Sequence, residues 1–368
     1  MSAEASPEKA DAAGGVPAVL RELLLARGPS GYERAPAQVW RDAAEPFASV
    51  SGDVVGTPLA VVAPKHGYES GARRLLVMGH IDEIGLIVTH IDDEGYLWFG
   101  GVGGWDPQIL IGQRVVLDTR EGPIPGVVGK KPIHLLRDEE RKKVAEMREL
   151  HIDIGARDGE QARGLVRIGD VAVIDADPVE LPNGRLVSRA LDNRLGSFVA
   201  LEAARLVAEA GGGEWELAAV AVAQEETTFG GSRTSAFALE PDAAIVVDVT
   251  HATDAPGIDV KEAGKHELGS GPVITRGSTL HPALFELLHD TAEAEKIPFT
   301  VEASARNTGT DADAVHLSRG GVPTGLVSIP LRYMHSPVEL VQLDDVHAAA
   351  RLIAAVALRL ERGTAFER

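Results

Sequence analysis

Histidine and carboxylate side chains recur in this sequence where short apolar segments end. These segments are rich in Val, Leu and Ile and have the length of strands that are buried on both faces. The residues at their ends are His80, Asp82, Glu225, Glu226, Asp248 and His335, and Asp192 stands at the start of a long helical pattern. Two imidazoles and three carboxylates from this set form a hard, oxygen-rich group that suits a pair of Zn, Co or Mn ions.

Each of these residues taken singly has an ordinary structural explanation. A histidine after a strand is commonly a loop or core residue, an aspartate at a helix start is commonly an N-cap, and adjacent glutamates commonly lie at a solvated edge. Their joint occurrence favours a site, because ligands of an open α/β sheet bind beyond the carboxyl ends of its strands.

The spacing within the set suggests separate roles. Asp82 follows His80 by two residues, so in an extended chain both side chains lie on the same side and Asp82 can orient the imidazole. Glu225 and Glu226 would face different ways in an extended segment, so that one binds metal and the other acts as a general base. Spacing alone leaves open which glutamate is the base. Asp192 is the candidate for a carboxylate that bridges two cations.

Other catalytic schemes find little support in the sequence. The chain has no cysteine, which excludes disulfides, thiolate metal sites and thiol catalysis. It has no Gly-x-Ser-x-Gly elbow for a serine hydrolase and no His-Glu-x-x-His motif for a single-zinc protease. Its glycine-rich pieces match neither a P-loop nor a dinucleotide fingerprint.

The elements that must position these residues alternate along the chain. Strands are expected at 74–78, 217–223, 243–247 and 324–329, and helices at 193–210, 282–296 and 343–362. Continuous apolar strands that alternate with helices predict an α/β fold, with a mixed, largely parallel sheet flanked by helices.

Residues 86–174 have a different sequence pattern. Glycine and proline interrupt this stretch at short intervals, and short alternating runs such as 113–119 lie between them, which is typical of a small β-barrel-like unit. A charged helical segment is expected at 137–150. The predicted organisation is therefore a disordered tail at 1–15, a catalytic α/β domain at 16–85 and 175–368, and an inserted β-rich domain at 86–174.

Composition restricts the class of protein. The net charge of −19 over 368 residues argues against nucleic acid as a partner, because phosphates require a basic surface. No signal-peptide pattern opens the chain, and no apolar run reaches the ~20 residues that cross a bilayer. We therefore expect a soluble, cytoplasmic protein with no membrane partner.

Seven segments resemble one known family, the tetrahedral or TET-type metallo-aminopeptidases, which include glutamyl and deblocking aminopeptidases. The matching segments are GHIDEIGLIV (79–88), KPIHLL (131–136), ELHIDIGA (149–156), RALDNRLG (189–196), QEETTFGG (224–231), VVDVTHATDAPG (246–257) and a long stretch at 307–339. This resemblance covers nearly the whole chain after the tail.

The resemblance implies a role for each residue of the set. His80 and Asp248 would be terminal ligands of one metal, Glu226 and His335 of the other, and Asp192 would bridge both. Glu225 would be the general base and Asp82 the orienter of His80. The resemblance also implies short peptides with a free N-terminus as substrates, Zn or alternatively Co or Mn as the two metals, and dimerisation through residues 86–174. Dimers of this family assemble into tetrahedral dodecamers.

Three other functions compete with an aminopeptidase. Another two-metal amidohydrolase, such as a deacylase or carboxypeptidase, would share the same metal chemistry. A glycosidase would need two carboxylates and no metal. A binding or scaffold protein could retain the fold without catalysis.

Overall fold

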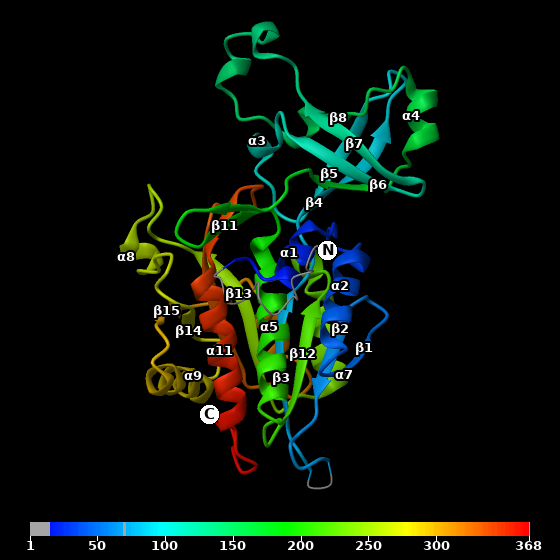
Figure 1. The fold of residues 1–368 in the computed structure, drawn as a ribbon. Helices are drawn as coiled ribbons and strands as arrows, with labels where there is room; N and C mark the ends of the chain where they lie inside the picture. The colour runs from blue at the N-terminus through cyan, green and yellow to red at the C-terminus, as the bar shows by residue number, and fades with distance from the viewer. Residues whose placement is uncertain (1–14, 69–70, 368) are drawn as a thin grey trace, which may run out of the picture.

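The computed structural model describes residues 15–68 and 71–367. All but the last residue of the tail expected at 1–15 lies outside this described part. The described chain forms a large sheet covered by helices, and a smaller barrel at the end of the sheet where β3 leads into β4 (Figure 1).

The large sheet contains eleven strands in the order β1-β2-β12-β3-β13-β16-β17-β11-β10, with β14 and β15 attached beside β16. Their bounds are β1 (Ser49–Gly52), β2 (Pro58–Val62), β3 (Arg74–His80), β10 (Val179–Leu181), β11 (Arg185–Ser188), β12 (Glu216–Val222), β13 (Ala243–His251), β14 (Val273–Gly277), β15 (Thr300–Ser304), β16 (Thr324–Arg332) and β17 (Glu339–Gln342). The central strands β12, β3, β13 and β16 run parallel, and the flanking strands β2 and β17 pair antiparallel to them.

Helices cover both faces of this sheet. One face carries α1 (Ala18–Leu25), α2 (Arg34–Ala44), α5 (Leu191–Glu209), α9 (Pro282–Glu295) and α11 (Leu343–Arg359), and the other carries α7 (Gly230–Leu239) and α10 (Ala312–Val315). Successive side chains of β3 point to opposite faces of the sheet and so contribute to both cores. Leu75 and Val77 pack into one cluster, and Leu76 and Met78 pack into the other.

The predicted α/β class and its three long helices are confirmed. The helices expected at 193–210, 282–296 and 343–362 are α5, α9 and α11, with ends shifted by at most three residues. Two further short helices, α6 (Glu225–Thr228) and α8 (Val260–Ala263), follow β12 and β13. Within the described residues, no helix is long and apolar enough to cross a bilayer.

A closed barrel forms from six strands in the order β4-β5-β8-β7-β6-β9. Their bounds are β4 (Gly85–Ile91), β5 (Leu97–Val102), β6 (Arg114–Thr119), β7 (Gly122–Gly129), β8 (His151–Asp153) and β9 (Val171–Ile174), with α3 (Pro107–Leu110) and α4 (Gly159–Leu165) between them. Inward side chains such as Leu86, Leu117 and Ile152 fill a core separate from those of the sheet. The β-barrel-like insertion expected from the glycine and proline spacing is therefore present.

The prediction of a helix at 137–150 is wrong. This stretch contains only single 3₁₀ turns at Glu140–Lys142 and Met147–Glu149. Most of its side chains are exposed, and only Leu150 and the partly buried Met147 pack against the barrel core, so no continuous apolar stripe stabilises a helix here.

Candidate active site

The carboxyl ends of the central parallel strands bring the expected residues to one edge of the sheet. β3 ends at His80, α6 begins with Glu225 and Glu226 just after β12, and β13 carries Asp248. β13 extends to His251, so Asp248 lies inside a strand rather than after it. Because neighbouring parallel strands end at the same edge, residues far apart in the sequence become neighbours in space.

Asp192 lies between the two histidines. Its Oδ1 is 3.1 Å from Nε2 of His80, and its Oδ2 is 3.3 Å from Nε2 of His335. Asp192 has non-helical backbone angles (φ −82°, ψ 105°) at the start of α5. The helical part of α5 is capped by Asn193, whose Oδ1 accepts the N–H of Gly196 at 2.8 Å, so the N-cap explanation for Asp192 is wrong and its carboxylate faces the two histidines instead.

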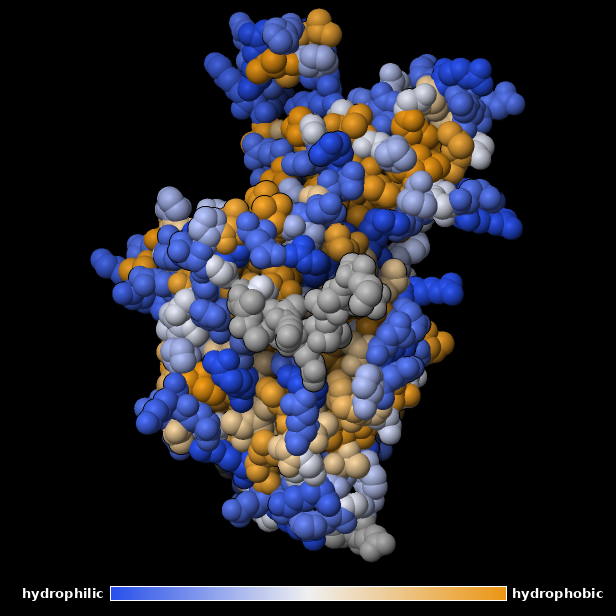
Figure 2. All heavy atoms as spheres, viewed as in Figure 1, coloured by the Kyte–Doolittle hydropathy of each residue, from blue (hydrophilic) through white to orange (hydrophobic). Residues whose placement is uncertain are grey.

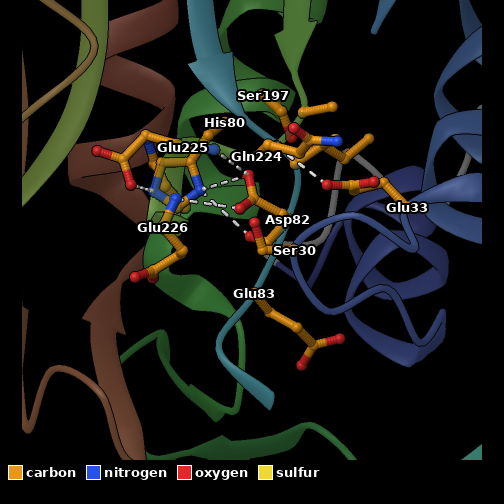
Figure 3. A network of polar contacts seen from close by, with 12 residues as sticks. Ser30, Glu33, His80, Asp82, Glu83, Ser197, Gln224, Glu225 and Glu226 are labelled. Carbon is orange, nitrogen blue, oxygen red and sulfur yellow. Dashed lines mark hydrogen bonds and ion pairs between the residues drawn. The ribbon is translucent and has the colours of Figure 1, made fainter. Parts of the chain in front are cut away.

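Asp82 connects His80 to the two glutamates (Figure 3). Its Oδ1 lies 3.5 Å from Nδ1 of His80 and accepts the backbone N–H of Glu225 at 3.1 Å, while its Oδ2 accepts that of Glu226 at 3.1 Å. The two glutamates stand in the first turn of α6 rather than in the extended segment that the sequence suggested. Their side chains diverge because successive helical residues point about 100° apart.

His335 is fixed by the loop that follows β5. Its Nδ1 lies 2.8 Å from the carbonyl oxygen of Gly104 and can donate its proton there, which leaves Nε2 to face Asp192 and Glu226. The distance from Nε2 to Oε1 of Glu226 is 3.4 Å. Residues 86–174 thus contribute directly to the geometry of the site.

The site buries more carboxylate charge than its two imidazoles neutralise. Burial raises the pKa of Glu225 to about 10, and it also raises the pKa of Glu226 and of Asp248. Burial alone would raise the pKa of Asp192 as well, but hydrogen bonds from both histidines hold it below the usual range. Divalent cations would supply the missing positive charge, and imidazole and carboxylate are ligands that such cations accept. The residues therefore fit a metal centre.

Sequence reasoning missed three buried acids near this centre. Glu339 accepts the backbone N–H groups of Asp192 at 3.1 Å and of His335 at 2.9 Å, and so holds two neighbours of the centre together. Glu33 accepts the N–H of Gln224 at 3.0 Å, just before the glutamate pair.

Asp311, the third of these acids, is 1% exposed, and neither of its oxygens accepts a hydrogen bond of ordinary geometry from any described residue. Burial raises the pKa of Asp311 to about 7, and the nearby hydroxyl of Ser232, which donates to the carbonyl of Phe229, lowers this pKa only in part. No local pattern identifies these acids, although Glu339 and Asp311 lie within the matching stretch at 307–339.

Comparison with known proteins assigns the chain to a family. Residues 60–352 match the M42 glutamyl aminopeptidase family. This chain belongs to the M42 family. The chain is 34% identical to the lysyl aminopeptidase of Pyrococcus furiosus over 92% of its own length and 95% of that protein's.

Two solved structures of TET peptidases have the same fold. The TET aminopeptidase of Thaumarchaeota archaeon SCGC AB-539-E09 superposes with a TM-score of 0.87 at 35% identity, over 93% of this chain and 96% of that one. The TET1 peptidase of Pyrococcus horikoshii gives a TM-score of 0.81 at 31% identity, over 93% and 99% of the two chains. The M42 chain described here is therefore a TET-type aminopeptidase, a hydrolase whose family implies divalent metals.

Proposed function

We propose that this chain removes residues from the free amino end of short peptides by two-metal hydrolysis. The observation that carries this proposal is the position of Asp192. Its two carboxylate oxygens face different imidazoles, so each oxygen can bind a different cation. One cation would be held by His80 and Asp248 and the other by Glu226 and His335, with Asp192 between them. Clusters of His80 with Asp192 and Glu226, and of His80 with Glu225 and Asp248, have donor atoms within 4.8 Å of one another.

Bound divalent cations supply Lewis acidity, which polarises the scissile carbonyl and makes a water more acidic. Glu225 is the proposed general base. Its side chain is 10% exposed, and its Oε2 lies 3.7 Å from Nε2 of His80, so its carboxylate faces the metal ligands. It takes the proton of the attacking water and passes it to the amine that leaves, a role that contributes about 10²–10⁴-fold in rate.

Asp82 is the proposed positioning residue. It accepts the N–H groups of both Glu225 and Glu226 and approaches Nδ1 of His80, so one buried carboxylate fixes the base and two ligands. Nδ1 of His80 lies 3.2 Å from the backbone carbonyl of Asp82, so the backbone of this residue sets the tautomer of His80 while its carboxylate holds the start of α6.

A metal-restoration assay tests the proposed function. The purified protein is stripped with a chelator, reloaded with Zn, Co or Mn, and assayed on aminoacyl chromogenic substrates beside their N-acetylated forms. We expect metal-restored cleavage of the free-amine substrates alone. Restored cleavage of the acetylated set would assign the metal centre to a deacylase or endopeptidase, and activity that survives complete stripping would point to a metal-independent hydrolase.

Residues 86–174 are the proposed dimerisation domain. Large apolar side chains are exposed along the segment after β7, with exposed fractions of 62% for Ile133 and 66% for Leu135. Figure 2 shows apolar surface gathered at the tip and across the barrel. The TET1 peptidase of Pyrococcus horikoshii can assemble into a tetrahedron or an octahedral shell. We propose that dimers of this chain assemble into a tetrahedral dodecamer.

A further inference from the structure

The metal donors form only part of the wall of a larger pocket. This pocket has a volume of about 360 Å³ and includes all six residues proposed as metal ligands or base. The rest of its lining comes from the end of β13, from the middle of β15 and from neighbouring loops, and includes Thr250, His251, Glu302, Thr308 and Met334. A side chain attached to a substrate at the metal centre would enter this part.

The sheet brings Glu302 to the pocket. β15 alternates between exposed residues, such as Val301, and half-buried ones, so that Glu302 faces inward. Thr275 of β14 stands opposite Glu302 across the parallel pair. On β13, Thr250 follows Asp248 by two residues and therefore shares its face, which connects the surroundings of Glu302 to a proposed metal ligand.

Glu302 has no strong cationic partner of its own. In the part of the chain that the structure describes, no lysine or arginine lines the pocket, and none forms an ion pair with Glu302. Burial raises the pKa of Glu302, while His251 and the hydroxyls of Thr250 and Thr275 favour its charged form. The other pocket carboxylates are proposed to face metal ions, so Glu302 remains as negative charge available to a ligand.

We infer that Glu302 selects peptides whose first residue is lysine or arginine. A cationic side chain would gain a partly desolvated carboxylate partner there, whereas a glutamate or aspartate side chain would meet like charge and no compensating cation. This inference rests on the proposed aminopeptidase function and adds the substrate class.

The test compares kcat/KM on Lys-, Arg-, Leu- and Glu-p-nitroanilide for the metal-loaded wild-type protein and two variants. We expect the wild type to favour Lys and Arg over Glu by about 100-fold or more. In Glu302→Gln the Lys/Leu ratio should fall by about tenfold or more, and in Glu302→Lys the Lys/Glu preference should shift toward Glu. Raising the salt concentration should also lower the wild-type Lys/Leu ratio.

The control is Glu286→Gln, which removes an exposed glutamate on α9 outside the pocket and should leave the Lys/Leu ratio unchanged. The inference would be overturned if the wild-type protein cleaved the Glu substrate as well as the Lys substrate, or if Glu302→Gln had an unchanged Lys/Leu ratio. In both cases the proposed aminopeptidase function would stand. If kcat/KM of Glu302→Gln falls equally on the Lys and Leu substrates, Glu302 binds the α-amine of the substrate rather than its side chain, and the inference is also overturned. If the metal-loaded wild type cleaves none of the four substrates, the proposed function fails and the inference fails with it.

Discussion

Glu83 forms a buried ionic cluster beside the active-site edge, and replacing it with glutamine tests how strongly this cluster holds the fold. Its carboxylate pairs with Arg189 and, at 2.8 Å, with Arg194. The three side chains are 3%, 8% and 0% exposed. Glu83 also accepts the N–H of Gly28 at 3.1 Å, and both arginines donate to the carbonyl of Ala26 just after α1. The cluster thus ties the segment after α1 to the segments that carry Asp82 and Asp192.

Glu83→Gln leaves two buried guanidinium groups without a negative partner. Breaking a buried ion pair by removing one partner costs about 3–5 kcal/mol. The entropy of unfolding is about 2.1 cal/mol/K per residue, which for 368 residues gives about 0.8 kcal/mol/K. The free-energy loss therefore corresponds to a fall in Tm of about 4–6 °C.

Scanning calorimetry at equal metal loading measures this change. The matched control is Glu209→Gln, because Glu209 pairs with Arg205 at the surface with 59% of its side chain exposed. An exposed pair of this kind contributes about 0.3–0.5 kcal/mol, so the control should lower Tm by less than about 1 °C. If Glu83→Gln behaves like the control, the buried cluster does not hold this edge of the domain and the reasoning is refuted.

Four further outcomes are expected. Glu225→Gln should retain both metals by elemental analysis but lose about 10²–10⁴-fold in kcat, because the proton acceptor is removed. Asp192→Ala should lose metal occupancy after gel filtration, because both cations share this ligand. Burial raises the pKa of Glu33 from 4.5 to about 7, so wild-type stability relative to Glu33→Gln should be highest below pH 4.5 and fall by about 3 kcal/mol by pH 7, measured by urea unfolding. Leu135→Glu should give a smaller species in sedimentation velocity, because a charge would enter an apolar contact.

Each of these outcomes can fail in a recognisable way. Full activity of Glu225→Gln would remove it as the base, and two tightly bound metals in Asp192→Ala would remove it as the bridge. A pH-independent difference between wild type and Glu33→Gln would show that Glu33 titrates normally in the folded chain. Unchanged assembly of Leu135→Glu, with the exposed Val179 of β10 changed to glutamate as the matched control, would place the contact elsewhere.

The sequence alone determined the α/β class and the set of residues at the edge of the sheet. Buried strands are local patterns, and the carboxyl ends of parallel strands meet at one edge whatever their order in the sheet. His80, Glu225, Glu226 and His335 could therefore be placed together before any coordinates. The long helices followed equally from local periodicity, whereas the charged segment at 137–150 did not form one, since a polar helix needs a packing partner that the sequence cannot show.

Only the tertiary structure decided how these residues are held. Asp192 faces two histidines because its backbone leaves the helical path, and Gly104, Glu339 and Glu33 reach the site through contacts between segments far apart in the chain. Glu302 faces the pocket because β15 lies beside β14 at the edge of the sheet. Local sequence patterns record which face of an element is buried, but hydrogen bonds and charges between distant elements depend on how those elements pack.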